Sequence, residues 1–100
     1  MDFLTQLNSA FDHRNRLGIM SVLMVNEWVE YSTLKNLLDL TDGNLASHLR
    51  ALENIEYVEI KKQFVGRRPQ TTYNVTEMGR KAFNEHLDGL EKLLLNGRKS

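Results

Sequence analysis

Apolar residues recur at helical spacing in the middle of the chain. Leu45, Leu49 and Leu52 stand at positions i, i+4 and i+7, which places them on one face of a helix. The preceding Thr41 has a hydroxyl that can accept a hydrogen bond from an unpaired N–H of the first turn, and Asp42 puts negative charge at the positive end of the helix dipole. The pattern therefore predicts a helix that begins after Thr41 and buries its leucines.

The other face of this predicted helix carries small or hydrogen-bonding side chains: Asn44, Ser47, His48 and Ala51. Just before it, inward-spaced leucines predict a shorter helix over Thr33–Leu40, capped by Ser32. Two short helices joined by a tight turn, the second with a polar outer face, are typical of a helix-turn-helix. The usual turn glycine is missing, so we expect an irregular turn at 39–41.

The rest of the pattern predicts further helices and a small sheet. We expect a helix at about 1–10, a helix from Asp12 or Asn15, a very short strand Glu30–Tyr31, strands Tyr57–Gln63 and Thr71–Val75, and a helix from Glu77 to about Leu95 capped by Thr76. The expected fold class is mainly α with a small antiparallel β-hairpin, in the order α-α-β-α-α-β-β-α of a winged helix-turn-helix. One hundred residues suit a single domain.

The segment between the last two predicted strands is basic. From Lys61 to Gln70 the sequence holds four cations, Lys61, Lys62, Arg67 and Arg68, and no acid, while Gly66 and Pro69 mark a loop. The whole chain has zero net charge, which disfavours nucleic-acid binding through bulk charge. One basic face on a neutral protein fits a specific binder of a few phosphates, and an ordinary mixed surface is the alternative.

Together these features resemble a known family. The runs Leu40–Glu53, Tyr57–Glu59 and Gly66–Tyr73, in this order and spacing, are similar to those of the small winged-helix transcriptional regulators related to MarR and ArsR. The resemblance covers about Asp12 to Leu95. It implies a cytoplasmic, homodimeric regulator that binds double-stranded DNA, with one helix in the major groove and the hairpin, or wing, on phosphates or in the minor groove.

The expected DNA contacts lie on the second helix of the helix-turn-helix, at the start of the first and on the wing. Asn44 can pair with adenine, and Ala51 can touch a thymine methyl group. Arg67 and Arg68 at the wing tip would enter a minor groove or grip its rim. The expected DNA-binding residues are Ser32, Thr33, Asp42, Gly43, Asn44, Ser47, His48, Arg50, Ala51, Lys62, Gly66, Arg67, Arg68 and Gln70.

Some of these positions leave an alternative open. Glycine in a helix costs about 1 kcal/mol relative to alanine, so Gly43 suggests close approach of the backbone to DNA, or else a loosely formed first turn. His48 can donate a hydrogen bond to a base or phosphate, or be a plain exposed histidine. His13, Arg14 and Arg16 precede an apolar helix, where we favour solvated surface over phosphate contact.

The last predicted helix carries a second apolar seam. Phe83, Leu87, Leu90 and Leu94 recur at steps of 4, 3 and 4, which is heptad spacing. We expect this long C-terminal helix, 77–95, to pair with its twin in a homodimer, together with the apolar N-terminal face of Phe3, Leu4 and Leu7. The alternative is packing of the seam on the chain's own core.

The composition argues against several other classes of protein. There is no cysteine, and the three histidines stand far apart, so we expect no metal site and no cofactor. No glycine-rich phosphate loop follows a strand and no nucleophile–base pair is evident, so we expect no enzyme. No apolar stretch approaches the roughly 20 residues that cross a bilayer, and no secretory signal is visible.

Two other functions remain open at the level of sequence. A winged helix can serve as a protein–protein interaction module, with its polar helix face against another protein; the uncompensated Arg67 and Arg68 favour phosphate instead. A regulator can also sense an unknown small-molecule effector between its terminal helices and its core. No residue pattern names such a ligand.

Overall fold

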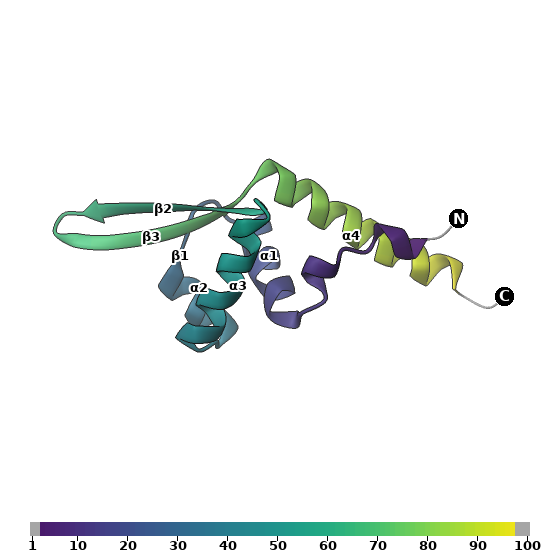
Figure 1. Ribbon diagram of the computed structural model, residues 1–100, viewed down its shortest axis with the longest axis horizontal. Coiled ribbons are helices and arrows are strands. Elements are labelled where there is room, and N and C mark those ends of the chain that lie inside the picture. Colours follow the sequence, from purple (N-terminus) through teal and green to yellow (C-terminus); the bar gives the residue numbers. More distant parts are fainter. Residues whose placement is uncertain (1–2, 98–100) are drawn as a thin grey trace.

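The computed structural model describes residues 3–97 of the chain. Two short 3-10 helices, η1 (Phe3–Gln6) and η2 (Ser9–Phe11), lead into helix α1 (Arg14–Met24). Strand β1 (Val29–Glu30), helices α2 (Tyr31–Leu38) and α3 (Asp42–Asn54), strands β2 (Val58–Val65) and β3 (Arg68–Val75), and helix α4 (Glu77–Asn96) follow in that order (Figure 1). This is a helix-turn-helix followed by a β-hairpin wing, and the predicted winged-helix fold class is confirmed.

The core lies between α1, α2, α3 and the root of the sheet. Leu45, Leu49 and Leu52 of α3 are buried, as their spacing predicts, and they belong to one cluster with Ile19 of α1 and Leu34 of α2. Burial of a leucine side chain contributes about 1.5–3 kcal/mol relative to its exposure. The three leucines therefore fix α3 on the body and leave its opposite side to solvent.

The sheet has three antiparallel strands in the order β1-β3-β2. Strands β2 and β3 pair along their whole length and end at the pair Val65–Arg68. The turn between them contains only Gly66 and Arg67, and Gly66 has φ +66°, a conformation that suits glycine. Consequently the hairpin projects from the helices as one long arm (Figure 1), and the molecule measures 61 × 25 × 21 Å.

Pairing to the tip makes the strands longer than predicted. Pro69 and Gln70 lie in β3 and not in a loop, while Tyr57 precedes β2. The expectation of a loop at 65–70 is therefore wrong, because the two-residue turn lets the ladder continue to Val65. Pro69 is tolerated within the strand at a position next to the turn.

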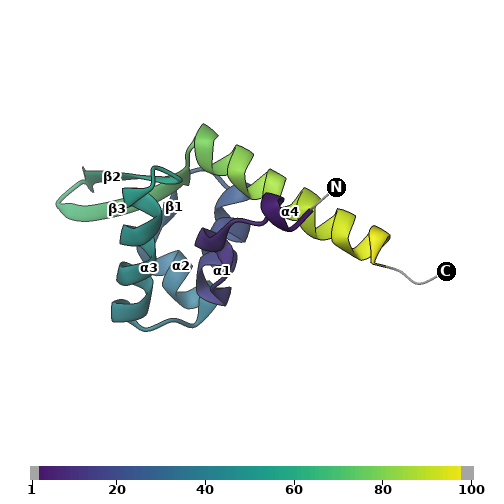
Figure 2. The same ribbon diagram turned by 45° about the vertical axis from the view of Figure 1, so that its right-hand side comes forward.

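Helix α4 begins on the end of the sheet and extends away from it. The Thr76 hydroxyl accepts a hydrogen bond from the Gly79 N–H at 2.9 Å, which is the predicted cap. Gly79 packs directly on the backbone of Tyr57: a Cβ at this position would lie 2.1 Å from the Tyr57 carbonyl oxygen. The first turn of α4 is thus anchored, and its later turns leave the body on the side opposite to the hairpin (Figures 1 and 2).

The N-terminal segment lies along the outer part of α4, as both ribbon views show (Figures 1 and 2). The Gln6 side-chain amide donates to Asp88 Oδ2 at 3.0 Å, and the Asn8 backbone N–H donates to His86 Nδ1 at 2.9 Å. A Cβ on Gly89 would lie 2.8 Å from Gln6 Cβ. A glycine at this point of α4 lets the segment approach closely.

Two predictions about the first half of the chain are wrong. The helix expected at about 1–10 is replaced within the described residues by η1 and η2, because Asn8 hydrogen-bonds to α4 between them; residues 1–2 lie outside the described part. Ser32 does not cap the next helix. Helix α2 starts at Tyr31 with Glu30 at its cap position, where no side-chain cap bond forms because Glu30 accepts from Gln70 and Ser32 instead.

None of the helices in residues 3–97 combines the length and the apolar character that a membrane span requires.

Candidate nucleic-acid interface

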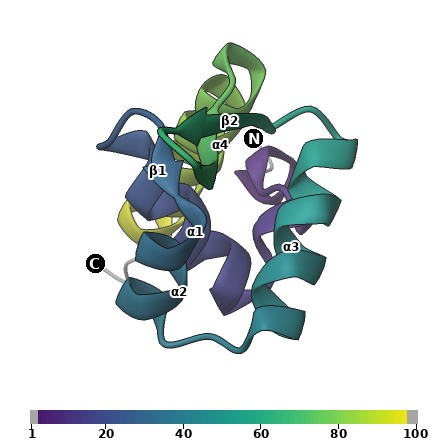
Figure 3. The same cartoon turned by 90° about the vertical axis from the view of Figure 1, so that its left-hand side faces the viewer.

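Helix α3 exposes a polar side opposite its leucines. Its first turn is fixed by Thr41, whose hydroxyl accepts from the Asn44 N–H at 3.2 Å, as predicted. We call its exposed Gly43, Asn44, Ser47 and Arg50 the outer face of α3. Figure 3 shows α2 and α3 side by side beneath the hairpin, with the turn that joins them at the far end. The outer face is therefore accessible to a large partner.

The turn between α2 and α3 works without glycine. Asp39 has φ 52°, in the left-handed region that aspartate tolerates better than most residues. The Leu40 N–H then donates to the Lys35 carbonyl at 3.2 Å, which closes the end of α2. The irregular turn that the sequence predicts at 39–41 is thus present.

The first residue of α3 is held by α2. Lys35 Nζ lies 3.1 Å from Asp42 Oδ1, and the Tyr31 hydroxyl donates to the Asp42 carbonyl oxygen at 3.1 Å. Burial raises the pKa of Tyr31, and the neighbouring Asp42 carboxylate adds to this shift. Of the expected DNA-binding residues, Asp42 is therefore placed to fix the angle between the two helices.

His48 does not lie on the outer face of α3. It is half-buried against α1, where Arg16 Nε donates to His48 Nδ1 at 3.1 Å and the His13 ring centroid is 4.3 Å from its own. Burial lowers the pKa of His48, and the charges of His13 and Arg16 lower it further. His13 in turn caps α1, because its Nδ1 accepts from the Asn15 N–H at 3.1 Å.

The expectation of solvated surface is confirmed for His13 and Arg14, which are exposed, and it is wrong for Arg16, which is half-buried. His13 and Arg16 also contact His48 on the flank of α3. Sequence analysis missed this contact because nothing in the sequence states how α1 crosses α3. Ala51 is half-buried too. A DNA contact by His48 or Ala51 stays a prediction.

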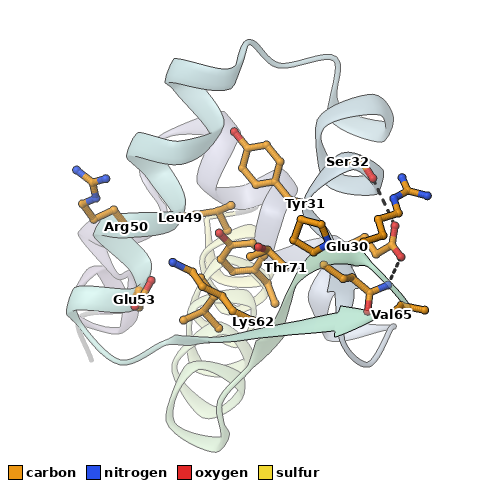
Figure 4. A pocket seen from close by; sticks show the side chains of 14 residues that line it. Glu30, Tyr31, Ser32, Leu49, Arg50, Glu53, Lys62, Val65 and Thr71 are labelled. Atoms are coloured by element: carbon orange, nitrogen blue, oxygen red, sulfur yellow. Dashed lines mark hydrogen bonds between the residues drawn. The ribbon is translucent and has the colours of Figure 1, made fainter.

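A groove of about 800 Å³ separates α3 from the hairpin. Figure 4 shows Arg50 and Glu53 on α3 at one side of this groove and Lys62 on the hairpin at the other. Arg68 also lines it, so three cations and the two acids Glu53 and Glu30 border the groove. The groove is thus a polar channel that joins the outer face of α3 to the wing.

Glu30 organises the end of the groove next to α2. The Gln63 side-chain amide donates to Gln70 Oε1 at 2.9 Å, and Gln70 donates to Glu30 Oε1. Ser32 Oγ lies 3.5 Å from Glu30 Oε2 (Figure 4). This chain of contacts links the hairpin to the start of α2. It engages Ser32 and Gln70, two expected DNA-binding residues. Sequence analysis missed Glu30, and an acid beside the predicted phosphate contacts at 32–33 was the available signal.

The wing carries the other expected cations. Lys61 Nζ lies 4.3 Å from the centroid of the Trp28 ring, so this lysine packs on the body. Lys62 faces the groove, and Arg67 and Arg68 are exposed at the tip. Within residues 3–97 neither tip arginine forms an ion pair. The structure therefore brings together α3 and the cationic hairpin, as predicted.

The expected dimer seam divides into a buried and an exposed part. Phe83 is only 4% exposed and packs edge-on against Phe11, with 5.1 Å between ring centroids, so its assignment to the seam is wrong. Core packing explains Phe83, because the first turns of α4 still lie over the body. Leu87, Leu90 and Leu94 are exposed. Of the N-terminal residues, Leu4 is exposed, and Phe3 and Leu7 are half-buried.

Residues 3–97 contain no group of three or more histidine, aspartate or glutamate side chains arranged to hold a metal ion.

The model of a protein family, described as "Winged helix DNA-binding domain", matches residues 15–94. The chain belongs to this family. The matched range includes the helix-turn-helix, the wing and nearly all of α4, so the winged-helix domain accounts for most of the protein.

Similar proteins agree with this assignment. An uncharacterized protein of Methanocaldococcus jannaschii is 38% identical over 81 residues, which are 81% of this chain and 88% of the relative. The solved structure of a transcriptional regulator homologue from Pyrococcus horikoshii OT3 is 30% identical, with a TM-score of 0.88 over 99% of this chain and 100% of that one. A crystal structure of MarR shares the winged-helix fold, with a TM-score of 0.75 at 19% identity over 97% of this chain and 73% of its own. The predicted resemblance to MarR-like regulators is confirmed.

Proposed function

We propose that this winged-helix protein is a homodimeric, sequence-specific regulator of transcription that binds double-stranded DNA. Helix α3 enters the major groove, and the wing lies on phosphates or in the adjacent minor groove. The observation that carries the proposal is the shared groove, which is lined by Arg50 of α3 together with Lys62 and Arg68 of the hairpin. A groove that spans a polar helix and a cationic arm suits a polyanion that is read by its base edges and held by its phosphates.

The outer face of α3 has the chemistry for reading bases. Asn44 can make two hydrogen bonds to adenine, and the Ser47 hydroxyl can donate or accept. Both are exposed and follow the fixed cap at Thr41, so they are held on a rigid helix and not on a loop. Arg50, one turn further along, can hold a phosphate at the edge of the same groove.

Dimerisation is proposed from the exposed part of the seam. Leu87, Leu90 and Leu94 lie on the part of α4 that leaves the body, and exposed apolar stripes of this kind mark interaction surfaces. A two-fold axis through α4 would place two copies of α3 on the DNA, and such dimers read half-sites about one turn, roughly 34 Å, apart.

The testing experiment is selection of bound sequences from a random pool of duplexes, followed by titration of the selected duplex at several salt concentrations. Arg67→Ala should weaken binding to all duplexes alike and reduce the salt slope by about one unit, because one phosphate contact is lost. Lys81→Ala removes another exposed cation, on α4, and is the matched control; its salt slope should stay as in the wild type.

A pool that yields no enriched sequence, with weak binding equally affected by both variants, would reject the proposal. In that case the polar face of α3 would be better explained as a protein–protein interaction surface. Circular dichroism of each variant shows whether the fold is intact.

A further inference from the structure

The tip of the wing exposes two large apolar side chains beside its arginines. Phe64 is 74% exposed and Val65 is 57% exposed, although both stand in the paired part of β2. At the root of the same strand Val58 is buried. An exposed aromatic residue on a projecting hairpin does not stabilise the isolated fold and favours aggregation, so its presence indicates a partner.

Phe64 is held in a defined position. Side chains alternate along a strand, so Phe64 lies on the same face of the hairpin as Ile60 and Lys62, which line the groove. Its cross-strand neighbour is Pro69, whose ring limits backbone motion, and the next pair closes the two-residue turn. The hydrogen bond between Gln63 and Gln70 braces the hairpin one residue further back. The tip is therefore a stiff apolar edge.

The charges around this edge are of one sign. Lys62, Arg67 and Arg68 are exposed within two to four positions of Phe64, and no acid occurs between Lys61 and Gln70. An acidic surface would be attracted to these cations, and an apolar side chain at their centre needs a partner with apolar surface between its negative charges. Stacked bases between two phosphate backbones meet both conditions.

We propose that Phe64 is an apolar wedge that enters the minor groove beside Arg67 and partly unstacks one base step. This inference rests on the proposed function and adds a second means of recognition to it. Wedges of this kind kink the duplex toward the major groove, and the cost is lowest at flexible pyrimidine–purine steps. The protein would thus select a TA or CA step at a fixed distance from the bases read by α3.

An anionic membrane is the main competing partner for an aromatic and basic tip. However, the cations do not gather at the tip alone, because Lys62 and Arg68 line the groove that ends at Arg50 of α3. A flat surface touched by the tip would leave Arg50 without a partner. A rod of negative charge that passes from the tip to α3 engages all of them.

The experiment uses the full chain and the duplex selected above, with 2-aminopurine at each step in turn across the flanking sequence. Wild-type protein should raise the fluorescence of the probe at one flanking step, because unstacking relieves its quenching. Phe64→Ala should abolish this rise and weaken binding by about tenfold, since a stacked aromatic contributes roughly that much. The salt slope should stay unchanged, because no charge is removed.

Two further variants sharpen the test. Phe64→Leu keeps an apolar side chain and should retain part of the fluorescence rise, whereas Val25→Ala shortens an exposed apolar residue on the body and should change nothing. If Phe64→Ala binds the selected duplex as tightly as the wild type and gives the same fluorescence, the proposal of a wedge is wrong, whereas the proposed regulatory function is unaffected. If no duplex is bound and the protein instead sediments with phosphatidylserine vesicles through Phe64, both proposals are overturned.

Discussion

The Arg16 guanidinium donates a hydrogen bond to His48 Nδ1 at 3.1 Å and so ties the start of α1 to the flank of α3. The bond requires an unprotonated Nδ1, and the neighbouring His13 ring, tilted by 42° to the His48 ring, adds no compensating negative charge. The position of α3 therefore depends on the neutral form of one histidine.

This dependence predicts a loss of stability in acid. Burial lowers the pKa of His48 below its usual 6.5 in the folded state. Above pH 6.5 the ring is neutral in both states, and its full contribution to stability is present. As the pH falls from that value through the folded pKa, the unfolded state takes up the proton more readily, so the free energy of unfolding decreases.

Urea unfolding at a series of pH values measures this effect. His48→Gln should show a shallower decrease below pH 6.5 than the wild type, because the titrating ring is gone. His13 and His86 remain in both proteins, so the difference between the two curves isolates His48. Superimposable pH profiles would show that the Arg16 contact does not govern stability.

A substitution at Gly43 should change the stability of the fold and its affinity for DNA in opposite directions. A Cβ on Gly43 would meet no heavy atom within 4 Å, so Gly43→Ala should raise the free energy of unfolding by about 0.5–1 kcal/mol. If the backbone here approaches DNA closely, the same methyl group should lower DNA affinity. Unfolding and DNA titration of one sample give both values. A more stable variant with unchanged affinity would show that the backbone at Gly43 does not approach DNA closely.

Gly79 should respond in the opposite sense. Its Cβ would lie 2.1 Å from the Tyr57 carbonyl oxygen, which belongs to the backbone and cannot rotate away. Gly79→Ala should therefore destabilise the fold by about 1–3 kcal/mol, the usual cost of overpacking. Thermal unfolding followed by circular dichroism measures the change, and Gly43→Ala is the matched control for the same substitution in another helix. Equal stability of the two variants would contradict the close packing of α4 on Tyr57.

The exposed leucines of α4 predict an effect on assembly. Leu87→Glu with Leu90→Glu would place four like charges at a two-fold apolar interface, and unpaired buried charges cost several kcal/mol. We expect a monomer that keeps the helix-turn-helix and loses specific DNA affinity by orders of magnitude, because the second set of contacts is gone. Light scattering, circular dichroism and DNA titration test this on one sample. A double variant that remains a dimer would place the interface elsewhere.

Much of the fold could be predicted from the sequence, because interactions between residues close in the chain determine it. Thr41 and Thr76 cap their helices as predicted, because a hydroxyl at a helix start acts on N–H groups only three residues away. The buried face of α3 could also be predicted, because its leucines recur at helical spacing. The cations of the wing also follow from spacing alone, since a hairpin brings near neighbours together.

Contacts between distant segments could not be read in this way. Phe83 and Leu87 share one heptad pattern, yet only Phe83 meets Phe11, because α4 passes beyond the body after its first turns. Ser47 and His48 are adjacent but point about 100° apart around the helix. His48 lies at the flank of the leucine stripe, where its contacts with α1 half-bury it. The helix expected in the N-terminal segment does not form, because the Asn8 backbone N–H donates to His86, which lies 78 positions further along the chain.

The packing of η1 on the outer part of α4 places η1 and the last turns of α4 together, on the side opposite to the hairpin (Figure 1). A short linker from one copy to the next would therefore be geometrically favourable, and a tandem single-chain form could carry two different wings. Such a form would allow one half-site to be altered while the other stays intact. Conversely, a bulky tag at either end would crowd the leucines of α4 long before it disturbed the hairpin.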